Sequence, residues 1–63
     1  MPLVIIKTLE GKTDEQKKRA VREVTEAIVK AFSVDKSAVW IIIEDIPKTN
    51  WGRSGLPATE WKK

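Results

Sequence analysis

Three blocks of apolar residues alternate with polar segments along the chain. The first block, Leu3–Ile6, is continuous, rich in β-branched residues and too short for a helix, which predicts a strand covered on both faces. The third block, Ala38–Ile46, is apolar at consecutive positions in its centre and predicts a second such strand. Between them, apolar residues recur at steps of three and four, which predicts an amphipathic helix of about five turns. These residues are Ala20, Val21, Val24, Ala27, Ile28, Ala31 and Phe32.

Polar and turn-forming residues mark where these elements end. Thr13–Gln16 has the form of a capping box, in which the Thr13 hydroxyl and the Gln16 side chain each satisfy a free backbone N–H, so a helix is expected to begin there. Residues 47–57 contain two glycines and two prolines, which predicts turns or a short hairpin. A polar tail, residues 59–63, follows and carries Trp61.

The order strand, helix, strand predicts an α/β fold made of a single β-α-β unit, residues 1–63, with parallel strands and a right-handed crossover. One helix covers only one face of a two-stranded sheet, yet both strands are apolar on both faces. A chain this short also has a thin core of its own, and it has no cysteine for a disulfide. We therefore expect oligomerisation to complete the fold.

Composition removes several classes of function. Without histidine or cysteine the chain lacks zinc ligands and the Ser-His and Cys-His nucleophile pairs. We therefore expect no metal site. Gly52–Gly55 lacks the lysine and helix of a phosphate-binding loop, and we expect no cofactor. The net charge of +3 is modest, and acidic and basic residues are mixed along the chain, which favours anions as ligands without requiring nucleic acid. The longest apolar run is too short to span a membrane, and no export signal begins the sequence, so we expect a cytoplasmic protein.

The remaining candidate for catalysis is an amine. If Met1 is removed, Pro2 becomes a secondary amine at the head of the first strand, and such an amine is a possible general base. If Met1 stays, the Pro2 nitrogen is an amide without basicity, and Pro2 only begins a strand.

A longer pattern of residues bears on this choice. It comprises Met1-Pro2, the run Leu9-Glu10-Gly11-Lys12-Thr13-Asp14-Glu15-Gln16-Lys17, the β-branched second strand and Asn50-Trp51-Gly52. With these residues the chain resembles the tautomerase superfamily, and within it the short 4-oxalocrotonate tautomerase group. The resemblance implies that Met1 is removed and that Pro2 acts as general base, moving a proton between the enol and keto forms of a small 2-oxo acid. It also implies a hexamer of β-α-β chains, with sites shared between subunits and no cofactor.

The resemblance assigns further site residues and shows where this chain departs from the family. Lys12 stands where the family usually has an arginine that binds the substrate carboxylate, so the charge remains but the bidentate fork is lost. Trp40 stands where well-studied members have a second arginine, so it is expected to shape an apolar site or to pack at a subunit contact. Trp51 aligns with an aromatic pocket residue. Arg53 is a further candidate for carboxylate binding, and Trp61 is expected to contact a neighbouring subunit.

Two alternatives remain open. In the first, protonated Pro2 acts as an acid in an enzyme that adds water to, or removes halide or carbon dioxide from, a small unsaturated acid. In the second, the chain is a weakly active or inactive subunit of an oligomer, which the tryptophan at position 40 favours. A homo-oligomer is expected, although a hetero-oligomer fits the second alternative.

Overall fold

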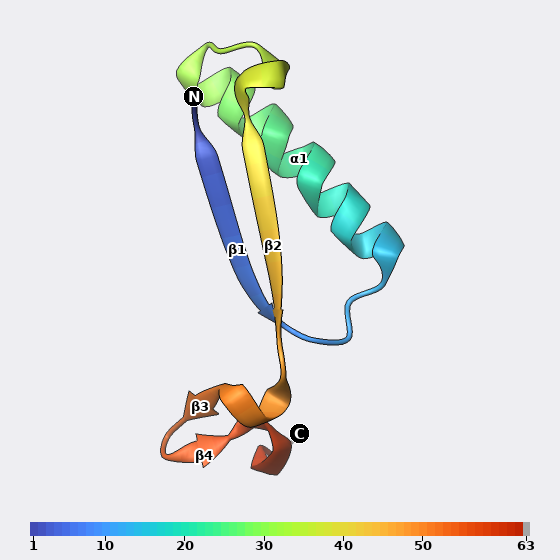
Figure 1. Cartoon of the computed structure of the whole chain (residues 1–63), viewed down its shortest axis with the longest axis vertical. Helices are drawn as coiled ribbons and strands as arrows, with labels where there is room; N and C mark the ends of the chain where they lie inside the picture. The colour runs from blue at the N-terminus through green and yellow to red at the C-terminus, as the bar shows by residue number, and fades with distance from the viewer. Residues whose placement is uncertain (63) are drawn as a thin grey trace.

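The computed structural model describes residues 1–62 and contains one β-α-β unit followed by a small C-terminal unit (Figure 1). Strand β1 (Leu3–Leu9) and strand β2 (Trp40–Ile46) pair in parallel, with Leu3 opposite Trp40 and Leu9 opposite Ile46. Helix α1 (Asp14–Phe32) connects them and lies against one face of the sheet. The predicted α/β fold is therefore confirmed. Within residues 1–62, no helix is both long and apolar enough to cross a membrane.

Helix α1 begins at the predicted capping box. The Thr13 hydroxyl accepts the backbone N–H of Gln16 at 3.1 Å, and the Gln16 side chain accepts the backbone N–H of Thr13 at 2.8 Å. These two bonds satisfy donors that a helix N-terminus otherwise leaves free. The helix ends at Ser33, whose φ of 54° lies in the left-handed region.

The second strand begins later than the sequence predicted. Residues Lys36–Ala38 form a short 3-10 helix, η1, and β2 starts only at Trp40. The cause is local, because the Asp35 carboxylate accepts the backbone N–H of Ser37 at 3.0 Å and its hydroxyl as well. Such a cap favours a turn over an extended chain. The expectation that Ala38 belongs to the strand was therefore wrong.

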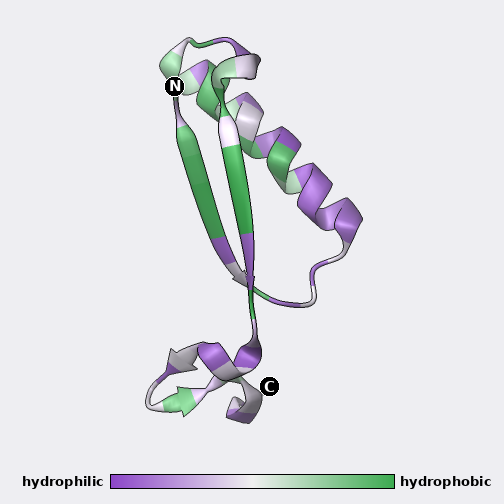
Figure 2. Ribbon diagram, in the orientation of Figure 1, coloured by the Kyte–Doolittle hydropathy of each residue, from purple (hydrophilic) through white to green (hydrophobic). Residues whose placement is uncertain are grey.

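The two faces of the sheet differ in exposure. The residues that face α1 are partly covered, and they include Val4, Ile6, Ile41 and Ile43. The residues on the other face, here called the open face, include Leu3, Ile5, Trp40 and Ile42, whose exposed fractions lie between 47% and 56%. Figure 2 shows hydrophobic colour along the middle of both strands, although only one face of the sheet has a helix over it. Within residues 1–62 no side chain is fully buried, so an isolated chain lacks a closed core.

The C-terminal unit lies at the far end of the molecule from the N-terminus (Figure 1). It contains the 3-10 helix η2 (Lys48–Asn50), the antiparallel strands β3 (Gly52–Arg53) and β4 (Leu56–Pro57), and the 3-10 helix η3 (Ala58–Glu60). Ser54 and Gly55 form the tight turn between the strands, with φ of 55° and 80°. The predicted short hairpin is confirmed.

Candidate active site

Pro2 lies immediately before β1, at the end of the sheet where β2 also begins. Its carbonyl accepts the backbone N–H of Trp40 at 2.9 Å, so the parallel ladder extends to Pro2 and fixes its position. Met1 is 86% exposed and projects beyond the sheet. With Met1 attached, the Pro2 nitrogen is an amide, and it gains basicity only when Met1 is removed.

Trp40 is the predicted site residue that the structure brings closest to Pro2. Its backbone bonds to Pro2, while its side chain lies on the open face opposite Leu3 and is 56% exposed. An indole offers one N–H donor and no charge. This end of the chain therefore combines a candidate base with an apolar surface.

The other predicted site residues lie at the end of the molecule opposite to Pro2. Lys12 follows the end of β1, whereas Trp51 and Arg53 belong to the C-terminal unit. A seven-residue strand separates them from Pro2, and at 3.3 Å per residue this strand is about 20 Å long. No single chain therefore brings Pro2 together with Lys12, Trp51 or Arg53. A site that uses both groups needs at least two chains.

Lys12 lines a groove of about 250 Å³ between the first turns of α1 and the sheet. The other residues that line it are Ile6, Thr8, Gln16, Lys17, Ala20 and Ile43. A side-chain hydrogen bond from Lys17 to Asp45 ties α1 to β2 beside this groove, and this bond raises the pKa of Lys17 above its ordinary value. Lys17 is thus held in place as a cation by Asp45. Lys12 lies in the loop between β1 and α1.

Trp51 lines a separate groove of about 380 Å³ at the edge of the open face. Its partners there are Lys7, Ile46, Asn50 and Gly52. Lys7 was not identified from the sequence, although a signal was present: it is the charged residue among the odd-numbered positions of β1, which are otherwise apolar. The groove therefore joins an aromatic wall to a cation.

Arg53 and Trp61 contact one another within the C-terminal unit. The Arg53 guanidinium carbon lies 4.1 Å from the centre of the Trp61 ring, which is a cation–π contact. The indole N–H of Trp61 donates to the Leu56 carbonyl at 3.0 Å. Trp61, expected to contact a neighbouring subunit, thus contacts its own hairpin.

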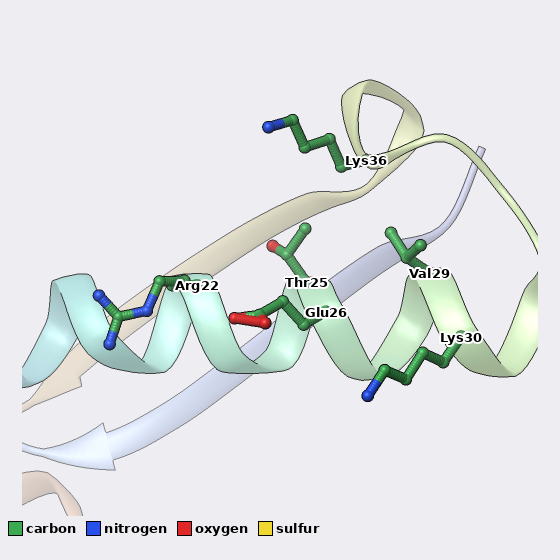
Figure 3. Close-up of a pocket in the computed structure, with 6 residues that line it drawn as sticks. All are labelled: Arg22, Thr25, Glu26, Val29, Lys30 and Lys36. Atoms are coloured by element: carbon green, nitrogen blue, oxygen red, sulfur yellow. The ribbon is translucent and has the colours of Figure 1, made fainter.

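A further groove lies between α1 and the segment that carries Lys36 (Figure 3). Its volume is about 590 Å³, and it is lined by Arg22, Thr25, Glu26, Val29, Lys30 and Lys36. Thr25 and Val29 point towards the segment that carries Lys36, while charges of both signs form the rim. None of the predicted site residues lines this groove. Within residues 1–62 there is also no cluster of carboxylates able to hold a metal ion.

Comparison with known proteins shows the family of the chain. Residues 2–60 match the family described as tautomerase enzyme. A 2-hydroxymuconate tautomerase from Comamonas testosteroni is 43% identical over 60 residues, which is 95% of each chain.

Solved structures of similar proteins share the fold as well. A 4-oxalocrotonate tautomerase isozyme from Methylibium petroleiphilum has a TM-score of 0.89 and 40% identity, covering 92% of this chain and 94% of its own. A heterohexamer 4-oxalocrotonate tautomerase from Chloroflexus aurantiacus has a TM-score of 0.93 and 35% identity, covering 98% of this chain and all of its own. On these grounds the chain belongs to the tautomerase family of enzymes.

Proposed function

We propose that this chain is a cofactor-independent tautomerase that converts the enol or dienol form of a small 2-oxo acid into its keto form, with Pro2 as general base. The observation that carries the proposal is the placement of Pro2, which is fixed by its bond to Trp40 and lies next to the exposed Met1. Removal of Met1 frees a secondary amine at a fixed position. The relative from Comamonas testosteroni supports 2-hydroxymuconate, a dicarboxylate, as the class of substrate.

The chemistry needs only a proton transfer. The neutral Pro2 nitrogen accepts the proton of the enol hydroxyl, the carbonyl forms, and the protonated nitrogen returns a proton to a carbon of the conjugated chain. A positioned base of this kind accelerates proton transfer by about 10²–10⁴-fold. Apolar neighbours favour the neutral amine, because they stabilise a charged one poorly.

Lys12 and Trp51 complete the site from neighbouring chains. They lie about 20 Å or more from Pro2 in the same chain, since the length of β1 separates them. In this proposal the Lys12 ammonium binds a substrate carboxylate as a point charge, Trp51 forms a wall of the pocket, and Trp40 adds an apolar surface beside the base. We propose a hexamer, in which other subunits cover the open face. The heterohexamer from Chloroflexus aurantiacus shows that a relative assembles from six chains.

Replacing Pro2 tests the proposal. In Met-free protein, verified by intact mass, Pro2→Ala is expected to lower kcat/KM for 2-hydroxymuconate by about 100-fold or more, while the oligomer stays intact. Pro47→Ala is the matched control, because Pro47 is an exposed turn proline far from the N-terminus. Because Met-free Pro2→Ala protein still has a terminal amine, the decisive result comes from protein that keeps Met1, in which the Pro2 nitrogen is an amide. Unchanged turnover in that protein rules out Pro2 as the base.

A second candidate function follows from Trp40. An uncharged indole stabilises a developing enolate less well than a guanidinium does, so this chain would act as a weakly active subunit that assembles with a second, different chain. The heterohexameric relative favours this reading. Purification of the chain from its native cells in a mixed oligomer would support it, whereas an active homo-oligomer would contradict it.

A further inference from the structure

The Arg53 side chain is held in place by an aromatic ring. Its guanidinium lies over the Trp61 ring at 4.1 Å, and within residues 1–62 it forms no ion pair. An exposed arginine beside a tight turn would otherwise sample many rotamers, because its long side chain has high conformational entropy. Contact with an aromatic face restricts that freedom and retains the charge.

The Trp61 ring is itself anchored on the residue opposite Arg53. Arg53 and Leu56 are paired across β3 and β4, and the indole N–H of Trp61 donates to the Leu56 carbonyl at 3.0 Å. Helix η3 turns the chain back so that Trp61 reaches this carbonyl, and the backbone N–H of Trp61 bonds to the Ala58 carbonyl. Trp61 is thus held through both its backbone N–H and its indole N–H.

This cation is built into the same unit as Trp51. Trp51 and Arg53 flank Gly52 in extended backbone, so their side chains leave the chain on the same side. The carbonyl of Trp51 accepts the backbone N–H of Ala58 at 2.8 Å, which ties Trp51 to η3, the helix that Trp61 directly follows. A pocket wall and a positioned guanidinium therefore move as one body.

We propose that Trp61 is a positioning residue that holds the Arg53 guanidinium ready to bind the second carboxylate of a dicarboxylate substrate. This inference rests on the proposed function. The aromatic ring occupies a face of the guanidinium, whereas the N–H donors lie in its plane and remain available at its edge. A planar fork binds a carboxylate through two parallel bonds, which the Lys12 ammonium cannot do. Arg53 thus gives selectivity for two carboxylates over one.

Binding of two matched ligands tests the proposal without requiring turnover. Muconate and sorbate are six-carbon dienoates that differ by the second carboxylate, and neither carries the enol to be converted. In isothermal titration of the assembled, Met-free protein we expect tighter binding of muconate. Arg53→Ala is expected to weaken muconate binding about tenfold, as the loss of a charged bidentate contact does, and to leave sorbate binding unchanged.

Variants of Trp61 separate positioning from a merely structural role. Trp61→Leu removes the ring and is expected to reduce the preference for muconate as Arg53→Ala does. Trp61→Phe keeps a ring under the guanidinium but loses the bond to Leu56, and most of the preference is expected to remain. The double variant Arg53→Ala/Trp61→Leu is expected to bind muconate no more weakly than Arg53→Ala alone. Arg22→Ala, in α1, is the control for loss of an arginine.

Two results would overturn the proposal. One is an unchanged preference for muconate in Arg53→Ala, and the other is an additive loss in the double variant, which would show that Trp61 acts independently of Arg53. Turnover of 2-hydroxymuconate is measured separately. Wild-type protein that prefers muconate through Arg53 but converts no enol would contradict the proposed function and leave the role of Arg53 and Trp61 standing.

Discussion

The nitrogen of Pro2 has opposite chemical character before and after the loss of one residue. Within the chain it is an amide, and at the terminus it is an amine with an unperturbed pKa of about 7.7–8.0. Leu3 and the Trp40 backbone hold this position at the edge of an apolar face. Apolar surroundings disfavour the charged form of an amine and favour the neutral form that a base needs.

The direction of the pH dependence distinguishes a base from an acid at Pro2. A base needs the neutral amine, so kcat/KM for 2-hydroxymuconate is expected to rise as the pH increases through the pKa of Pro2 and then to level off. A general acid needs the charged amine and gives the reverse. A pH profile of kcat/KM in Met-free protein measures this, and activity that declines across the neutral range would favour the hydratase or dehalogenase alternative.

At the same scale, the sequence marks candidate site residues but not the contacts that they make. Pro2, Lys12 and Trp51 stand out because residue type and spacing mark them in the sequence. The contact between Arg53 and Trp61 could not be predicted, since it depends on how η3 folds back over β4. Lys7 was overlooked because its place beside Trp51 depends on the face of the sheet on which it lies, and the strand register fixes that face.

At the scale of elements, short polar caps decide where the strands and the helix begin. Thr13 and Gln16 predicted the start of α1, because both hydrogen bonds of the capping box join residues only three positions apart. The start of β2 was predicted two residues too early, since the apolar character of Ala38 and Val39 favoured a strand and the Asp35 cap outweighed it. The hairpin in residues 52–57 followed from the two glycines and two prolines of residues 47–57.

The Asp35 cap is expected to stabilise the protein in a pH-dependent way. Its hydrogen bonds from the Ser37 hydroxyl and backbone N–H hold the pKa of Asp35 below its ordinary value of 3.8. A lowered pKa means that the folded state prefers the carboxylate, so the stabilisation is present at neutral pH and is lost as the pH falls through the lowered pKa.

Asp35→Ala is therefore expected to lower Tm at pH 7, and the difference in Tm from the wild type is expected to shrink on acidification below about pH 4. Thermal unfolding followed by circular dichroism measures both. Ser37→Ala keeps the backbone N–H but removes the hydroxyl. Its Tm at pH 7 is therefore expected to lie between the Tm of the wild type and that of Asp35→Ala. A Tm difference that stays constant or grows as the pH falls would contradict this role for Asp35.

At the scale of the whole molecule, an isolated chain is incomplete in two respects. Its extents are 42 × 23 × 16 Å, and no residue of 1–62 is fully buried, because the open face has nothing over it. Its candidate base lies at one end and its candidate carboxylate contacts lie at the other. We expect assembly to remedy both. It would bury the open face, and it would bring the candidate base of one chain near the candidate carboxylate contacts of another.

Complementation between two defective chains tests the central claim, a Pro2-dependent site shared between subunits, most directly. Pro2→Ala and Lys12→Ala chains are unfolded, mixed in equal amounts and refolded together, and kcat/KM for 2-hydroxymuconate is compared with that of each parent refolded alone. In a random mixture about a quarter of the sites combine an intact Pro2 from one chain with an intact Lys12 from another. The account predicts activity clearly above the mean of the two parents. Activity that never exceeds that mean would show that the site does not join these residues across chains.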